Sequence, residues 1–174
     1  MLDILRLYLG IAFLRRGPED LPASNALQWL TILAYCGAMA LASAIAGVPQ
    51  EQWLGPLAID VVLTLIWLRI LLQIVQRPER MLQTTSAVFG LQVLLTPLAV
   101  PLARLAATQT QGELPPPHVL LLLFAVSIWS LVATARILRS ALDWRMGACI
   151  ALVIVQALVV HLLVALLFIE APKA

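Results

Sequence analysis

Three ionisable residues interrupt long apolar runs in this sequence: Asp60, His161 and Arg104. Charged and titratable side chains are rare inside such runs, and in many membrane proteins they mark proton or ion pathways. A histidine titrates near neutral pH, so an acid and a histidine that lie together can pass a proton between them. The alternative is a structural tie, in which Asp60 pairs with Arg104 or His161 and thereby fixes which helices are neighbours. Both readings require that separate elements place these side chains at one depth.

The composition indicates what those elements are. Of 174 residues, 62% are hydrophobic and 11% are charged, whereas soluble domains average about 45–50% apolar and about 25% charged residues. The apolar runs are continuous and lack the alternation of barrel strands, so the spans are expected to be helices that satisfy their own backbone hydrogen bonds. The predicted fold class is therefore an all-α integral membrane protein.

Runs of about 20 apolar residues predict where the helices cross the bilayer. Five runs meet this length, at residues 26–48, 54–75, 86–107, 119–137 and 146–169. We expect them to form one five-helix transmembrane domain over residues 26–174.

The distribution of positive charge predicts the orientation. With five spans, nine arginines fall on one side of the membrane, namely Arg6, Arg15, Arg16, Arg69, Arg77, Arg80, Arg136, Arg139 and Arg145. Only Arg104 and Lys173 fall on the other side. Positive residues favour the cytoplasmic side, which predicts a cytoplasmic N-terminus and a periplasmic C-terminus. We also expect the basic connections to set this orientation, or to attract anionic lipid headgroups.

Depth along the helices groups the polar residues into one layer. Asp60 starts about 9 Å below the outer end of its predicted span, because a helix rises 1.5 Å per residue. Its short side chain cannot reach the headgroups as that of Arg69 can at the other end. The same slab of the outer leaflet contains His161, and Arg104 reaches toward it. Its other members are hydroxyl-bearing residues on three different spans: Ser43, Thr64 and Ser127.

The segment before the first span contains a different pattern. Residues 1–16 are apolar but too short to span before Arg15 and Arg16. They predict an amphipathic helix that lies on the cytoplasmic surface. Residues 17–25 are rich in turn-forming residues and predict a linker, in which Ser24 or Asn25 can cap the first span.

Small residues recur every four positions along the first span, at Ala34, Ala38, Ala42 and Ala46. Helices in lipid associate where small residues let their backbones approach closely. We therefore expect this stripe to pack against a neighbouring helix, either within the bundle or in a second copy of the chain.

Catalytic motifs are missing from the sequence. It has no HExxH motif, no GxSxG motif and no phosphate-binding glycine loop, and its two histidines and two cysteines do not have the spacing of a metal site. We therefore expect no enzyme activity, no cofactor and no bound metal.

The stretch GPEDLP, at Gly17 to Pro22 just before the first span, resembles the Asp-Leu and Gly-Pro elements of the Yip-domain membrane proteins. In that family the Gly-Pro pair follows the Asp-Leu pair, whereas here it precedes it. The topology of five spans with short loops is also similar to that family. The resemblance implies a non-enzymatic membrane protein that binds other membrane proteins or shapes lipid, and it assigns no catalytic residue.

Two functions stay open at this point. The first is a structural, scaffold or assembly partner in a bacterial inner membrane. The second is a small transporter or proton-coupled subunit that uses Asp60, His161 and Arg104. The expected partners are the lipid bilayer and other membrane proteins or further copies of the chain. Nothing in the composition indicates nucleic acid, and no small-molecule substrate can be identified from these residues.

Overall fold

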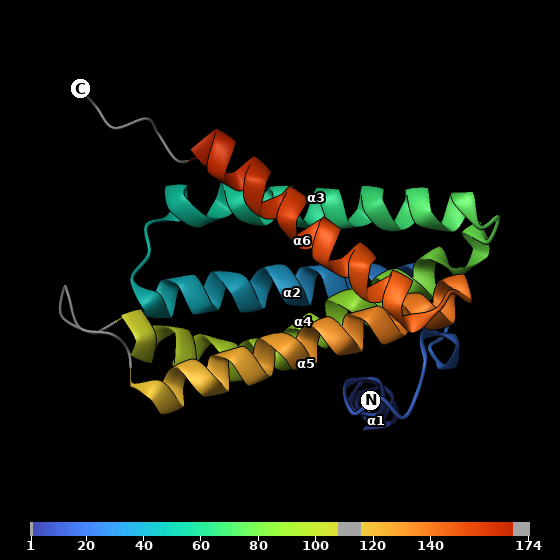
Figure 1. The fold of residues 1–174 in the computed structure, drawn as a ribbon, viewed down its shortest axis with the longest axis horizontal. Helices are drawn as coiled ribbons and strands as arrows, with labels where there is room; N and C mark the ends of the chain where they lie inside the picture. Colours follow the sequence, from blue (N-terminus) through green and yellow to red (C-terminus); the bar gives the residue numbers. More distant parts are fainter. Residues whose placement is uncertain (1, 108–115, 169–174) are drawn as a thin grey trace.

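The computed structural model describes residues 2–107 and 116–168 of the chain, apart from the side chains of residues 2, 3, 103, 104, 106 and 107. Every regular element within these ranges is a helix. Among them, five are long and apolar enough to cross a membrane. The prediction of an all-α bundle of five spanning helices preceded by a short helix is confirmed (Figure 1).

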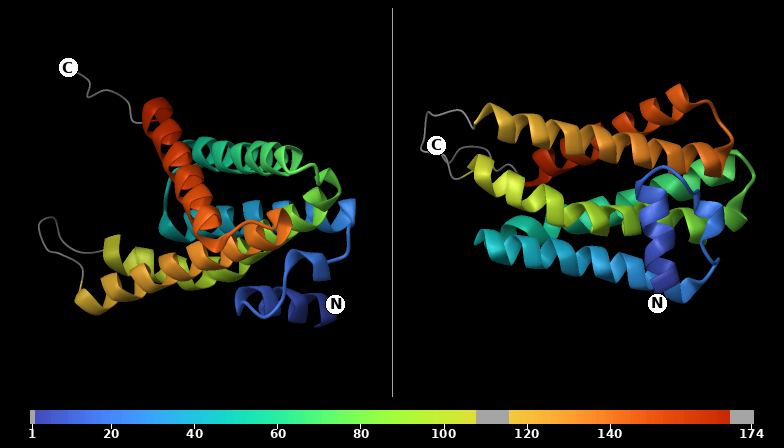
Figure 2. Two further views of the ribbon diagram at one scale, coloured as in Figure 1. Left: turned by 45° about the vertical axis from the view of Figure 1, so that its right-hand side comes forward. Right: turned by 90° about the horizontal axis from the view of Figure 1, so that it is seen from below.

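The spanning helices run back and forth between the two ends of the bundle, and the last of them is inclined to the others (Figures 1 and 2). They are α2 (Asn25–Ala46), α3 (Gln50–Ile74), α4 (Met81–Ala107), α5 (Pro117–Leu142) and α6 (Met146–Phe168), with one-turn helices η1 (Pro18–Asp20) and η2 (Pro78–Arg80) before α2 and α4. We call the end with the α3–α4 and α5–α6 connections the basic end, because most of the arginines lie there, and the other end the opposite end.

Two helices begin earlier than hydropathy predicts. α3 begins at Gln50 rather than at residue 54, and α4 begins at Met81 rather than at residue 86. The added turns contain polar residues, and these residues lower the mean hydropathy, so a search for apolar runs leaves them out. At the start of α4 these residues include Thr84 and Thr85, which are fully buried against neighbouring helices rather than exposed in a loop.

The core of the bundle lies toward the basic end. α4 is central and packs against α1, α2, α3 and α5. Its neighbours contribute the last turns of α3 and α5 and the first turn of α6, where small residues such as Ala133, Ala141 and Cys149 are at most 1% exposed. Small buried residues allow close helix packing, which is the main source of helix association in lipid.

Helix α1 (Leu2–Ala12) lies across the spanning helices rather than along them (Figure 2). Tyr8 packs into a notch at Gly90 of α4, where a side chain would overlap its ring. The indole nitrogen of Trp129 on α5 donates a hydrogen bond to the carbonyl of Ala12 at 3.0 Å. Burial of the Tyr8 phenol raises its pKa to about 12, so it stays neutral. These contacts hold α1 against the α4 and α5 side of the bundle.

The GPEDLP stretch is also tied to the bundle. Leu21 is 1% exposed, and the Gln83 amide nitrogen donates a hydrogen bond to the Leu21 carbonyl at 2.6 Å. Ser24 caps α2 by accepting a hydrogen bond from the Leu27 backbone nitrogen. The segment predicted as a linker is therefore an ordered connection with one turn of helix.

Candidate functional site

Asp60 lies deeper in the bundle than the sequence predicted. Because α3 begins at Gln50, Asp60 follows ten residues of helix and lies about 15 Å from the opposite end. Fourteen residues follow it before α3 ends at Ile74. The predicted depth of about 9 Å is corrected by the extra helical turn. The carboxyl therefore lies near the middle of its helix.

The hydrogen-bond partner of Asp60 is Tyr35, which the sequence analysis missed. The Tyr35 hydroxyl donates to the Asp60 carboxylate at 2.8 Å and so ties α2 to α3. The ring of Tyr35 also packs on Phe89 of α4, with centroids 5.4 Å apart. Tyr35 lies eleven residues before the end of α2, and Asp60 lies ten residues after the start of α3. At the rise of a helix, both residues are therefore at about the same level of the bundle. Counting depth for every polar residue would have found it.

His161 does not form the predicted ion pair with Asp60. Within the described residues no ion pair joins the two side chains, and the His161 Nδ1 atom lies 2.8 Å from the Ala157 carbonyl of its own helix. His161 is exposed rather than on a buried face of α6. α6 crosses the bundle obliquely (Figure 1), and this tilt moves its outer half away from α2 and α4.

A neutral pair supplies a second tie near the same depth. The Gln156 amide nitrogen on α6 donates to the Thr64 hydroxyl on α3 at 2.9 Å. Thr64 is 4% exposed. This contact joins α3 and α6 one turn below Asp60, so helix pairing at this level does not rest on the carboxyl alone.

Asp60 faces a cavity of about 790 Å³ to which all five spanning helices contribute. Four predicted residues line it together: Asp60, Thr64, Ser127 and His161. Most of the remaining wall is apolar, and its further polar residues are Tyr35, Gln92, Thr96, Ser130, Thr134 and Gln156. A mostly apolar cavity with a few placed polar groups is typical of a binding site for a small molecule.

A smaller cavity of about 330 Å³ leads from this site toward the opposite end. Ser43, the fifth predicted residue, lines this second cavity together with Gln52 and Trp53. The two cavities share Tyr35, Asp60 and His161 in their walls. Toward the basic end the bundle is filled by Leu68, Leu72 and Leu138, each 1% exposed. These packed side chains fill the bundle on the side of the basic end, whereas the smaller cavity reaches residues near the opposite end.

Two further predictions concern Arg104 and the alanine stripe of α2. Arg104 belongs to α4, but its side chain lies outside the described residues, so its predicted approach to Asp60 stays a prediction. The alanine stripe of α2 is unevenly covered: Ala42 is buried and Ala38 half-buried, whereas Ala34 and Ala46 are exposed. α2 packs on α4, and only the central part of the stripe is enclosed.

These observations define the class of protein: a multi-pass, all-α membrane protein with a carboxyl-bearing cavity between its helices. No protein-family model, curated protein or solved structure matches the chain. The geometry of the cavity is therefore the basis on which a function can be proposed.

Proposed function

We propose that this chain is a non-enzymatic membrane protein that takes up a proton or a small cation at Asp60, as a small transporter or a proton-coupled subunit. The observation that supports this function is the cavity of about 790 Å³, which all five spans line and which contains one carboxyl. A scaffold has no need for such a space. An ionised carboxyl in apolar surroundings is stable only with a cation or a network of donors, and otherwise it holds a proton.

The surroundings of Asp60 favour exchange over a permanent tie. Among the described side chains it has one neutral donor, Tyr35, and no ion-pair partner. The smaller cavity gives it a route to the opposite end past Ser43 and Gln52. The packed leucines close the route toward the basic end. In this proposal the site exchanges its ligand with one side of the membrane.

The proposal also includes the membrane in which the protein lies and its orientation there. By the positive-inside rule we place the basic end in the cytoplasm and the opposite end in the periplasm of a bacterial inner membrane. The cavity would then open to the periplasm, where protons and cations enter. The similarity of GPEDLP to the Yip-domain proteins also stays a proposal, and it is compatible with either function.

A flux assay tests the proposal. The full chain is reconstituted in liposomes that contain a pH-sensitive dye, and a potassium gradient with valinomycin drives protons inward. We expect flux above that of protein-free liposomes in the wild type and in Asp60→Glu, which keeps the carboxyl. Asp60→Asn should fall to the rate of protein-free liposomes. Asp143→Asn removes an equal charge at the basic end, outside the cavity, and should leave the flux unchanged.

A scaffold is the second candidate, and one observation favours it. Ala34 and Gly37 on α2 are exposed, and a Cβ at Gly37 would meet no atom within 4 Å. Such a flat face suits a partner helix. If Asp60→Asn destabilises the bundle and an Asp60→Arg, Arg104→Asp exchange restores it, the carboxyl is architectural and the scaffold function replaces the transporter.

A further inference from the structure

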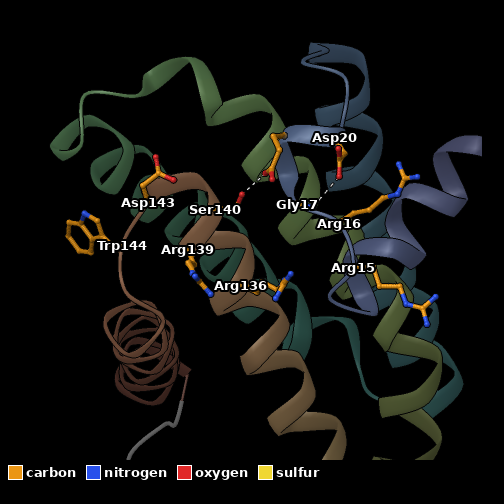
Figure 3. Close-up of a pocket in the computed structure, with 10 residues that line it drawn as sticks. Arg15, Arg16, Gly17, Asp20, Arg136, Arg139, Ser140, Asp143 and Trp144 are labelled. Carbon is orange, nitrogen blue, oxygen red and sulfur yellow. Dashed lines mark hydrogen bonds between the residues drawn. The ribbon is translucent and has the colours of Figure 1, made fainter.

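A separate pocket of about 480 Å³ lies at the basic end, between the segment that follows α1 and the last turns of α5. Four arginines line it: Arg15 and Arg16 on the α1 side, and Arg136 and Arg139 on the α5 side. Figure 3 shows Arg136 and Arg139 extending from α5, while the guanidinium groups of Arg15 and Arg16 turn away from α5 and form the rim.

The turn after α1 positions Arg15 and Arg16, and helix α5 positions Arg136 and Arg139. Leu14 adopts a positive φ of 60° and ends α1, and the Arg15 and Arg16 backbone nitrogens then bond to the Gly10 carbonyl at 2.8 and 3.1 Å. The stem of Arg16 packs on Gly10, where an added Cβ would lie 2.8 Å from its Cδ. Arg136 and Arg139 are three residues apart on α5 and therefore share one face of that helix.

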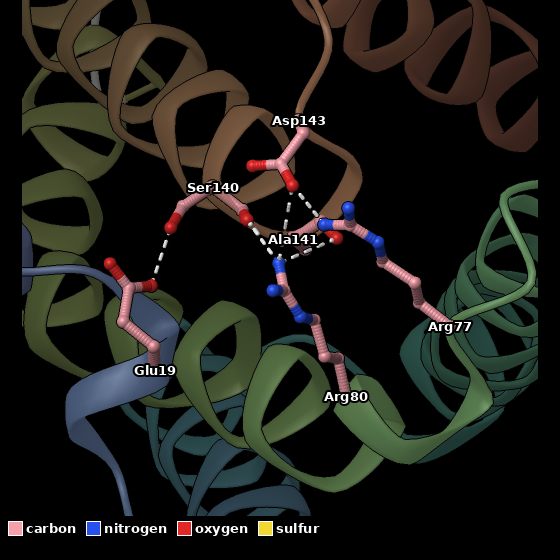
Figure 4. A network of polar contacts seen from close by, with 6 residues as sticks. All are labelled: Glu19, Arg77, Arg80, Ser140, Ala141 and Asp143. Carbon is pink, nitrogen blue, oxygen red and sulfur yellow. Dashed lines mark hydrogen bonds and ion pairs between the residues drawn. The ribbon is translucent and has the colours of Figure 1, made fainter.

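Three acids, Glu19, Asp20 and Asp143, also line the pocket, and each is engaged by a donor other than the four pocket arginines (Figure 4). Asp143 is paired with Arg77 and lies 4.0 Å from Arg80, and Glu19 accepts a hydrogen bond from the Ser140 hydroxyl. The remaining acid, Asp20, accepts a bond from the Gly17 backbone nitrogen at 3.3 Å.

Within the described part of the chain, no ion pair joins any of the four pocket arginines to an acid. The pocket lining itself has four arginines and three acids, which leaves a net charge of +1. Arg77 and Arg80, which lie outside the lining and face Asp143, raise the net charge of the whole group to +3.

We propose that this pocket binds the phosphate of an anionic lipid headgroup. A guanidinium group matches phosphate oxygens with paired donors, and Arg136 and Arg139 present two of them to one space. Arg15 and Arg16 at the rim supply a second pair of positive charges. Such a site draws its ligand both by charge and by directed hydrogen bonds.

The apolar surroundings favour a lipid over free phosphate. On the outer face of α1 the side chains of Leu5, Leu9 and Phe13 are 49%, 40% and 62% exposed, although the opposite face of the helix is buried. These side chains present an apolar surface on the segment that leads to Arg15 and Arg16, and acyl chains can lie against it. Trp144, 37% exposed, lines the pocket at the end of the span, where tryptophan prefers the membrane interface.

Native mass spectrometry on the full chain in a neutral detergent tests this site. The probes are phosphatidylglycerol, which is anionic, and phosphatidylcholine, which has no net charge, at matched chain length. We expect the wild type to bind phosphatidylglycerol about tenfold more tightly, a difference of about 1.4 kcal/mol, because the arginines attract the net negative charge of its headgroup. Arg136→Gln with Arg139→Gln should remove most of this preference.

A matched variant controls for total charge. Arg69 and Arg145 are exposed arginines at the same end of the bundle and do not line the pocket, so Arg69→Gln with Arg145→Gln should keep the preference. If the α5 variant does not fold, the double variant Arg15→Gln with Arg16→Gln tests the other wall of the pocket, because these two residues are outside the spans. It should also reduce the preference for phosphatidylglycerol. Equal loss in the control, or an unchanged preference in both pocket variants, overturns the proposal. Displacement of the lipid by millimolar inorganic phosphate would assign the pocket to a soluble phosphate instead.

Discussion

The two halves of the bundle, divided near the level of Asp60, are packed in different ways. In the basic half, small side chains such as Thr84, Ala87 and Ala133 are fully buried and the helices touch along several turns. In the opposite half, large apolar side chains such as Leu121 and Leu166 are 68% and 70% exposed, and the cavities open between the helices. Lipid exerts no hydrophobic force that drives helices together, so packing alone decides where they stay in contact.

Polar contacts follow the same division. The basic end has the Arg77–Asp143 pair, two hydrogen bonds from Arg80 to carbonyls at the end of α5, and the link from Gln83 to Leu21. The bonds near the cavity are fewer and join neighbouring pairs of helices, as Tyr35 and Asp60 do. We infer that the basic half provides stability and holds the helices in order, so that the opposite half can leave a space among them. Regions with few buried contacts open most readily, which suits the part of a protein that binds and releases a ligand.

Paired leucine truncations on one helix give the largest expected contrast between the halves. Leu138 is 1% exposed in the basic half of α5, and Leu121 is 68% exposed in the opposite half. We expect Leu138→Ala to lower the free energy of unfolding by about 2–4 kcal/mol, because it leaves a cavity in a packed core. Leu121→Ala should change it by less than about 0.5 kcal/mol. Unfolding of both variants by dodecyl sulfate in mixed micelles measures the difference, and equal losses would show that the halves are equally packed.

A pair of glycine substitutions tests the docking of α1 with a smaller effect. A Cβ at Gly90 would overlap the Tyr8 ring, whereas a Cβ at Gly37 has open space around it. We expect Gly90→Ala to lower the free energy of unfolding by about 1–3 kcal/mol through overpacking. Gly37→Ala should be neutral or stabilise by up to about 1 kcal/mol, because alanine is the better helix former. The same micelle titration measures both, and a neutral Gly90→Ala would mean that α1 is not fixed against α4.

The sequence predicted the number of long apolar helices and which polar residues share a level of the bundle. Long apolar runs predicted the five spans, and rise per residue placed Asp60, Thr64, Ser127 and His161 close enough to line one cavity. It did not predict which way each helix turns, because rotation about the axis depends on neighbours that a single sequence does not contain. His161 was therefore expected on a buried face, whereas Tyr35 was missed although its depth along α2 matches that of Asp60 on α3. The early start of α3 was missed because Gln50, Glu51 and Gln52 score as polar although they are helical.

The smallest expected effect concerns the polar network of the basic half. The hydrogen bond from Arg77, with the positive charges of Arg77 and Arg80, holds the pKa of the Asp143 carboxyl below its usual value. A carboxyl with a lowered pKa adds stability at pH values above its unfolded pKa of about 3.9, and this contribution is lost as the pH falls through its folded pKa. The wild type should therefore be slightly more stable than Asp143→Asn at pH 6, and the gap should close below about pH 4.

Asparagine accepts the positive φ of 56° at this helix end, so the substitution removes charge without straining the backbone. Because the Asp143 side chain is 59% exposed, added salt should shrink the gap at pH 6 as well. A gap that is independent of both pH and salt would mean that the pair adds nothing to the basic half, and that its stability comes from the packing of small side chains alone.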